Sequence, residues 1–269
     1  MQIPAKVNLG LNIVTRRPDG YHNLETVFYP VPIFDEISME YAPATSGNGQ
    51  VTLHLEGIEV LGKVEDNLVV RACKLLIEDF PQLAALDITL RLTKNIPTQA
   101  GMGGGSADAS YTLLLINDTF SLGLTAGQLE SYALKLGADC PFFIRSTPAF
   151  ATGIGEVLSP VELDLRGMFM AVIKPDIAIS TREAFSKVVP AKPAICCKDI
   201  VMEPVETWRD RLKNDFEQSA FALYPELAAI KQRLYDAGAT YAAMSGSGSA
   251  MFGIFREKPN IEGAYILEL

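Results

Sequence analysis

Metal-binding and disulfide-forming residues are scarce in this chain of 269 residues. It has two histidines and four cysteines, and no cysteines show the Cys-x-x-Cys spacing of a structural zinc site. This composition argues against a zinc-stabilised fold and favours a location in a reducing cytoplasm. Positive charge is also in short supply, because 23 lysines and arginines face 32 aspartates and glutamates, for a net charge of -9. Nucleic acids and anionic membranes are therefore poor candidate partners.

Long apolar runs are missing as well. Purely apolar stretches, such as Leu113 to Ile116 and Met168 to Ile173, are far shorter than the ~20 residues of a membrane span. Residues 1 to 10 lack a basic region followed by an apolar run, so no export signal is predicted. With 48% hydrophobic and 20% charged residues, the chain can form one large or two modest globular domains. We expect a soluble cytoplasmic protein.

Glycine is concentrated in one segment, where residues 97 to 110 read Pro-Thr-Gln-Ala-Gly-Met-Gly-Gly-Gly-Ser-Ala-Asp-Ala-Ser. Before this segment, Ile88, Leu90 and Leu92 alternate with polar residues, which predicts a half-buried strand. After it, an apolar face without proline or glycine predicts a helix with Ser106 as its N-cap. The predicted order is therefore strand, glycine loop, helix.

A loop of this kind suits an anion, because glycines bring backbone N–H groups close to a ligand and a helix N-terminus adds unpaired donors. The Walker pattern does not fit, since Gly105 is followed by Ser106 and not by lysine. The dinucleotide fingerprint does not fit either, since Ser106 stands where a third glycine is needed. The alternative interpretation is a flexible or tightly turned connector.

Near the start of the chain, Lys6, Asn8 and Asn12 alternate with apolar residues, which predicts a strand with one polar face. That face either meets a ligand or is the solvent side of an edge strand. Turn-forming residues 16 to 20 then predict a hairpin with Tyr21 and His22 at its base.

Asp139 is an ionisable residue in an otherwise apolar segment, and burying it without a partner is unfavourable. It follows a predicted helix that starts with a capping box of Thr125 and Gln128. Asp139 either works at a site or caps a short turn before Pro141. The neighbouring Cys140 is interpreted as a small buried residue and not as a nucleophile, because neither histidine is close in sequence.

The remaining pattern predicts a second lobe and an α+β fold, because strands and helices do not alternate regularly. We place the domains at residues 1–152 and 153–269. The other expected elements are a loop from 42 to 50, a helix from 67 to 78, a strand from 168 to 173, a helix opened by a capping box at 180 to 183, an irregular segment from 190 to 204, a helical region from 214 to 235 broken near Pro225, and two strands joined by Ser-Gly-Ser-Gly-Ser between 242 and 255.

Three segments together resemble the signature motifs of the GHMP small-molecule kinases. They are Pro4-Ala-Lys-Val-Asn-Leu-Gly-Leu-Asn12, residues 97 to 110, and Ala243-Met-Ser-Gly-Ser-Gly-Ser249. Further details, such as Arg-Pro-Asp-Gly-Tyr-His-Asn-Leu and Gly-Ala-Asp-x-Pro-Phe-Phe, are similar to members that phosphorylate a cytidine diphosphate-linked polyol of the non-mevalonate isoprenoid pathway. The resemblance covers nearly the whole chain. It implies a two-lobed fold with an N-terminal lobe like ribosomal protein S5 and a ferredoxin-like C-terminal lobe.

The resemblance also implies roles for individual residues. Lys6 and Asp139 would form the catalytic pair at the acceptor hydroxyl. Asn8, Tyr21, His22, Thr181 and Phe185 would bind the cytidine diphosphate part of the substrate. Asn67 and Asn95 would lie near the adenine or ribose of ATP. The other residues implied to bind ATP are Pro97, Thr98, Gln99, Ala100, Gly101, Met102, Gly103, Gly104, Gly105, Ser106, Ala107, Gly246 and Gly248.

The expected chemistry is phosphoryl transfer, which depends mainly on alignment and on neutralising charge. Lys6 would keep Asp139 ionised, and Asp139 would accept or orient the proton of the hydroxyl. No carboxylate outside Asp139 is marked as a ligand of Mg²⁺, so largely phosphates, Ser106 and water would hold it. A monomer or weak homodimer is expected. The alternatives are a homoserine, mevalonate or sugar kinase of the same family, a non-catalytic nucleotide-binding regulator, and a purely structural protein.

Overall fold

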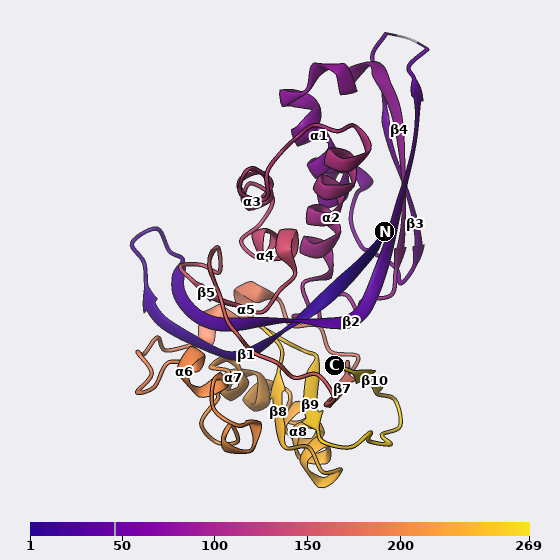
Figure 1. Ribbon diagram of the computed structural model, residues 1–269. Coiled ribbons are helices and arrows are strands. Elements are labelled where there is room, and N and C mark those ends of the chain that lie inside the picture. Colours follow the sequence, from indigo (N-terminus) through magenta and orange to yellow (C-terminus); the bar gives the residue numbers. More distant parts are fainter. Residues whose placement is uncertain (46) are drawn as a thin grey trace. The chain divides into compact units, whose positions relative to one another are not determined.

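The structure, a computed structural model, describes residues 1–45 and 47–269 (Figure 1). The chain forms two compact units, each built from separate stretches. The first unit comprises residues 1–5, 33–98 and 103–146, and the second comprises residues 6–32, 99–102 and 147–269. Both units combine strands with helices, which confirms the predicted α+β class. No helix of the described residues is long and apolar enough to cross a membrane.

The first unit packs helices against part of a mixed sheet. Its strands are β3 (Val51–Gly57), β4 (Leu86–Lys94), residues 2–5 of β1 (Gln2–Arg16) and the part of β2 (His22–Pro43) from residue 33 onward. Strand β4 pairs antiparallel with β2 and parallel with β3. Its helices are α1 (Leu68–Asp79), α2 (Gly104–Thr119), α3 (Ala126–Leu134), α4 (Cys140–Arg145) and the short 3-10 helices η1 (Val64–Asp66) and η2 (Pro81–Ala85). Figure 1 shows α1 and α2 side by side, and α1 also contacts β3.

The core of this unit follows from the apolar periodicity. Ile88, Leu90 and Leu92 of β4 are buried, as their alternation predicts, and Leu76 of α1 and Leu113 of α2 are fully buried as well. The predicted helix near residue 67 begins at Leu68, because the Asn67 side chain accepts the backbone N–H of Val69 at 2.9 Å. The capping box of Thr125 and Gln128 is also present.

One expectation for this unit is wrong. Helix α2 begins at Gly104 and not after Ser106, and its N-cap is Gly103, with a φ of 73°. Serine is the better N-cap in general, but only glycine adopts this left-handed conformation without strain. Ser106 therefore lies within the first turn of α2. The loop predicted from 42 to 50 begins after β2 ends at Pro43, and residue 46 lies outside the described residues.

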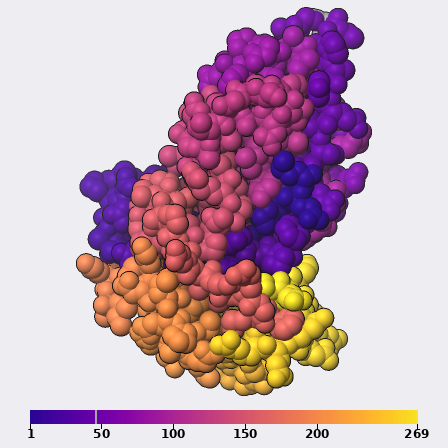
Figure 2. Space-filling model, viewed as in Figure 1, coloured from indigo at the N-terminus to yellow at the C-terminus, as the bar shows by residue number. Residues whose placement is uncertain are grey.

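The second unit contains the rest of the chain. Its strands are β1 (Gln2–Arg16) from residue 6 onward, the first part of β2, β5 (Ala149–Thr152), β6 (Val157–Pro160), β7 (Phe169–Ile173), β8 (Tyr241–Met244), β9 (Met251–Phe255) and β10 (Tyr265–Glu268). Its helices are α5 (Thr181–Lys187), α6 (Cys197–Val201), α7 (Phe216–Leu223), α8 (Pro225–Asp236) and the 3-10 helix η3 (Val205–Thr207). In Figure 2, the orange to gold α7–α8 region and the yellow C-terminal segment form one continuous surface.

An antiparallel sheet with the strand order β10-β7-β9-β8 forms the centre of the second unit. Helix α8 packs on β8 and β9, where Leu234, Met244 and Met251 are fully buried. The predicted strand pair around the Ser-Gly-Ser-Gly-Ser segment and the helix break near Pro225 are both confirmed.

Two further expectations for this unit are corrected. The segment from 190 to 204 is not wholly irregular, since it includes α6, whose Cys197 and Ile200 are buried. The alternative that the polar face of the first strand is exposed to solvent is wrong, because Lys6 and Asn8 are each only 2% exposed. A buried lysine requires compensating oxygen atoms, and these define the candidate site.

Candidate active site

The middle of the glycine loop, residues 99–102, belongs to the second unit and bonds to other residues of that unit. The backbone N–H of Lys6 donates to the Met102 carbonyl at 3.0 Å, and that of Ala250 donates to the Ala100 carbonyl at 3.2 Å. Gly101 has a φ of +71°, and a Cβ there would lie 1.9 Å from the Ser245 carbonyl oxygen. The loop can therefore approach Ser245 only because residue 101 has no side chain.

The Ser-Gly-Ser-Gly-Ser segment meets the loop at this point. The Ser245 hydroxyl donates to the Gly101 carbonyl at 2.9 Å, and a Cβ on Gly246 would lie 3.1 Å from the same oxygen. The Asn214 amide holds the segment by donating to the carbonyls of Met244 and Gly246, both at 2.8 Å. Residues of the three signature segments thus lie together. From the sequence, Asn214 has no predicted role beyond its place at the start of the helical region from 214 to 235.

Lys6 is buried at the same place. Its Nζ donates to Asn8 Oδ1 at 2.7 Å and to the Gly101 carbonyl at 2.9 Å, and it lies 4.9 Å from the centre of the Phe28 ring. Asn8 in turn donates to the Thr26 hydroxyl at 3.0 Å. These contacts fix the Lys6 ammonium group beside the loop backbone, which is the position that a cation needs to neutralise an anion held there.

The start of helix α2 supplies backbone donors in the first unit. The N–H groups of its first turn have no partners within the helix, and they lie at the positive end of the helix dipole. Gly105 is exposed, and the space where its Cβ would stand is open. This geometry can bind an anion such as a phosphate.

Asp139 lies in the first unit, immediately before α4, and it is half-buried. It occupies the N-cap position of α4 but makes no capping hydrogen bond with its side chain, so the turn-capping alternative receives no support. The next residue, Cys140, is fully buried, and burial raises the pKa of its thiol to about 11. Its thiolate is therefore scarce at neutral pH, which fits the interpretation of Cys140 as a buried filler.

An aromatic group in the second unit joins the hairpin to α5. The His22 and Phe185 rings stack with centroids 5.1 Å apart and an angle of 22° between their planes. Phe185 also meets Phe216 edge to face at 4.9 Å, while Tyr21 is 61% exposed. Thr181 begins α5, after Ser180 has capped the helix. The structure therefore brings the His22 and Phe185 rings together.

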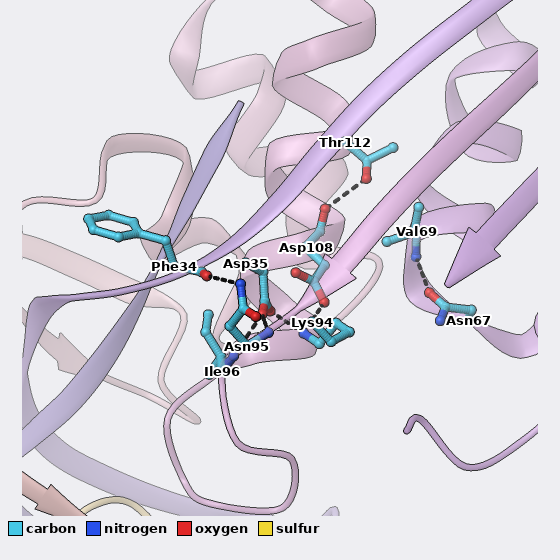
Figure 3. Close-up of polar contacts among 9 residues, drawn as sticks. All are labelled: Phe34, Asp35, Asn67, Val69, Lys94, Asn95, Ile96, Asp108 and Thr112. Carbon is cyan, nitrogen blue, oxygen red and sulfur yellow. Dashed lines mark hydrogen bonds and ion pairs between the residues drawn. The ribbon is translucent and has the colours of Figure 1, made fainter. Parts of the chain in front are cut away.

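Asn67 and Asn95 are engaged elsewhere with their side chains. Asn67 caps α1, and the Asn95 amide donates to the Phe34 carbonyl at 3.0 Å (Figure 3). Beside Asn95 lies a group that sequence reasoning missed, in which Lys94 bonds to both Asp35 and Asp108. All three side chains are buried. The available signal was the alternation of β4, since Lys94 follows Ile88, Leu90 and Leu92 on the inward face.

The described residues contain no group of three or more histidine, cysteine, aspartate or glutamate side chains that could hold a metal ion. A divalent cation carried mainly by the phosphates of a ligand does fit, because such ions keep several water molecules and need few protein ligands.

Comparisons with known proteins agree with this geometry. The family model "GHMP kinases N terminal domain" matches residues 67–147, and "GHMP kinases C terminal" matches residues 203–265. These ranges contain the glycine loop, Asp139 and the Ser-Gly-Ser-Gly-Ser segment. The fold, the site and these matches therefore assign the chain to the ATP-dependent small-molecule kinases.

Curated relatives narrow the class. A protein of Bacteroides fragilis is 50% identical over 96% of this chain and 92% of its own length, and one of Porphyromonas gingivalis is 46% identical over 98% and 94%. Both are named 4-diphosphocytidyl-2-C-methyl-D-erythritol kinase. The chain belongs to the family of these kinases within the GHMP kinases.

A solved structure titled as a crystal structure of 4-(cytidine 5'-diphospho)-2C-methyl-D-erythritol kinase matches with a TM-score of 0.78 and 35% identity, over 94% of this chain and 88% of its own. The homoserine kinase of Cytophaga hutchinsonii matches with a TM-score of 0.66 but only 16% identity, over 95% of this chain and 85% of its own. The second match shows a shared fold alone.

Proposed function

We propose that this protein transfers the terminal phosphoryl group of ATP to the 2-hydroxyl of 4-diphosphocytidyl-2-C-methyl-D-erythritol. The observation that carries this proposal is the meeting of the three signature segments around Gly101, in a chain that shares about half its residues with kinases of that name. Phosphoryl transfer needs alignment and charge stabilisation more than covalent chemistry, and fixed backbone donors supply both.

For ATP, the proposed phosphate site is the glycine loop from Pro97 to Ala107, with Gly246 and Gly248 beside it. The loop offers N–H donors that glycine leaves accessible, and the first turn of α2 adds partial positive charge. Asn67 and Asn95 are proposed to lie near the adenine or ribose. Because their side chains already bond to backbone groups, they would shape that site more than contact the base.

For the metal ion, we propose that Mg²⁺ is held by the ATP phosphates, water and Ser106. Ser106 suits this role because it lies in the first turn of α2, where the phosphates would bind. The ion would supply neutralising charge to the phosphate oxygens. Loss of metal-dependent ATP binding in Ser106→Ala would support the assignment, whereas unchanged metal dependence would contradict it.

For catalysis, we propose that Asp139 orients the acceptor hydroxyl and accepts its proton, and that Lys6 is the partner that favours the ionised carboxylate. Lys6 belongs to the second unit and Asp139 to the first, so their pairing is part of the proposal. The burial of Lys6 and its hydrogen bonds to Asn8 and Gly101 support a fixed role for its charge.

For the acceptor, we propose that Asn8, Tyr21, His22, Thr181 and Phe185 bind the cytidine diphosphate part. The stacked His22 and Phe185 rings offer an aromatic surface, and the exposed ring of Tyr21 offers a second one. Aromatic faces stack on nucleobases, and an imidazole can hydrogen-bond to a base edge. A small polyol or amino acid has no base that would use such a surface.

We also propose a domain division at residues 152 and 153, a cytoplasmic location, and a monomer or weak homodimer. The net charge of -9 makes nucleic acid and anionic membrane surfaces poor partners, so the proposed partner is the small-molecule substrate alone.

The deciding experiment measures ADP release by the purified protein with Mg-ATP and each of several acceptors. We expect turnover with 4-diphosphocytidyl-2-C-methyl-D-erythritol and none with homoserine, with mevalonate or without an acceptor. Turnover only with another acceptor would reject the proposed substrate while leaving the kinase class intact. ATP binding without turnover on any acceptor would point to a nucleotide-binding regulator.

A further inference from the structure

Three charged side chains meet where the chain leaves β4 and where it enters α2 (Figure 3). Lys94 Nζ bonds to Asp35 Oδ2, and it donates to Asp108 Oδ2 at 2.6 Å. Lys94 and Asp108 are each 3% exposed, and Asp35 is completely buried. These residues, named here the buried charge cluster, come from β2, β4 and α2 of the first unit.

The buried charge cluster fixes backbone as well as side chains. Asp35 Oδ1 accepts the backbone N–H groups of Asn95 at 2.5 Å and Ile96 at 2.7 Å, which are the first residues after β4. At the other end of the loop, a Cβ on Gly104 would lie 3.3 Å from Lys94 Nζ, so the ammonium group packs against the first residue of α2. The cluster therefore ties together the two ends of the glycine loop that belong to this unit.

Stability alone does not explain such a cluster. Removing two carboxylates and one ammonium group from water is unfavourable, and well-packed apolar side chains of similar volume are often at least as stabilising. Asp108 Oδ1, moreover, is buried and has no hydrogen-bond partner among the described residues. The ionic arrangement fixes the direction of the backbone N–H groups that it holds, which apolar packing does not do.

We propose that Asp35, Lys94 and Asp108 are positioning residues for the nucleotide, which hold the two ends of the glycine loop so that its N–H donors face the ATP phosphates. The inference rests on the proposed function, since it concerns the same phosphate site. It assigns no contact with ATP to these side chains. Their effect passes through Asn95, Ile96 and the first turn of α2.

The two carboxylates differ in a way that a matched pair of variants can test. Asp35 accepts three donors, and an asparagine there would replace one accepting oxygen by an N–H₂ group. Asp108 accepts one donor through Oδ2, and its buried Oδ1 has no hydrogen-bond partner among the described residues. An asparagine there has nearly the same shape and keeps one oxygen that can accept from Lys94. Asp35→Asn should therefore disrupt the buried charge cluster. Asp108→Asn should preserve the cluster, whereas Asp108→Ala should disrupt it.

The experiment measures the dissociation constants of ATP and, separately, of 4-diphosphocytidyl-2-C-methyl-D-erythritol, with folding checked by circular dichroism. We expect Asp35→Asn and Asp108→Ala to weaken ATP binding by about tenfold or more, and Asp108→Asn to stay within about threefold of the parent chain. Affinity for the acceptor should change by less than about twofold in each folded variant. Asp118→Asn, on the exposed face of α2, is the control for losing one negative charge.

Each outcome has a defined meaning. Parallel loss of both affinities in folded Asp108→Ala would indicate a general structural role and overturn the proposal, as would ATP binding as tight as that of the parent. If Asp35→Asn fails to fold, the comparison of Asp108→Ala with Asp108→Asn decides, because both keep the Lys94–Asp35 pair. A parent chain that binds no ATP would instead reject the proposed function itself.

Discussion

Replacing Asp108 by asparagine should change how the stability of the protein depends on pH. The side chain is buried beside Lys94 and Asp35, and the pKa of its carboxyl is raised from 3.8 to about 7. Burial is the main cause, the Lys94 charge opposes it, and the Asp35 charge adds to it. Asparagine cannot titrate, so the variant removes this contribution while keeping an oxygen that Lys94 can donate to.

The direction and size of the effect follow from proton linkage. Well below the unfolded pKa of 3.8, both the folded and the unfolded chain hold the Asp108 proton, and its stabilising contribution is fully present. As the pH rises to about 7, the folded protein keeps a proton that the unfolded chain has lost, so stability falls. A difference of about three pKa units, at 1.36 kcal/mol per unit, gives a loss of about 4 kcal/mol over this range. The pH interval from 5 to 8 contains about 3 kcal/mol of it.

The assay is urea unfolding of the parent chain, Asp108→Asn and the exposed control Asp118→Asn at several pH values between 5 and 8. The free energy of unfolding of Asp108→Asn should gain on that of the parent by about 3 kcal/mol across this interval, whereas the Asp118→Asn curve should run parallel to that of the parent. A constant difference between Asp108→Asn and the parent would refute the reasoning. It would mean that Asp108 is ionised in the folded protein throughout.

Three more predictions concern the glycine loop, the acceptor and catalysis. Gly101→Ala should lower the free energy of unfolding by about 2 kcal/mol or more, because Gly101 has a φ of +71° and a Cβ there would lie 1.9 Å from the Ser245 carbonyl oxygen. Gly105→Ala is the control, because the space around Gly105 is open, and it should not lower this free energy. Equal effects of the two substitutions in urea unfolding would contradict the prediction. Asp139→Ala should lower kcat by about 100-fold or more with ATP binding preserved, and near-normal turnover would remove Asp139 from the mechanism. Phe185→Leu should raise KM for the cytidine-bearing acceptor by about tenfold and leave KM for ATP unchanged; a shift in the ATP value alone would refute its assignment.

Local signals in the sequence predicted the elements that depend on neighbouring residues. The alternation in β4, the capping box of Thr125 and Gln128, and the glycine turns between β8 and β9 all have their physical cause within a few residues. The start of α2 was missed for a related reason. The preference of serine for the N-cap is a local tendency, and it gave way to the left-handed backbone that Gly103 adopts at the end of the loop.

Contacts between distant residues could not be predicted in this way. Asp35 and Lys94 are 59 positions apart, and Asn214 reaches a carbonyl 32 positions away. Sequence periodicity says which face of a strand is buried, but not which side chain of another element meets it. The alternation of β4 extended to Lys94 would have placed a lysine on the buried face, and thereby required a buried carboxylate near it. It would not have indicated Asp35 or Asp108.

The two buried lysines show how so acidic a chain can serve an anionic ligand. A net charge of -9 gives no general attraction for ATP, so binding has to depend on charges and dipoles fixed at the site. Lys6 holds the Gly101 carbonyl within the loop, and Lys94 holds the carboxylate that binds the backbone where the loop begins. Each ammonium group is unfavourable to bury, and each is satisfied by oxygen atoms that also orient the loop. Fixed donors of this kind need no reorganisation when charge moves during phosphoryl transfer, whereas mobile surface lysines would.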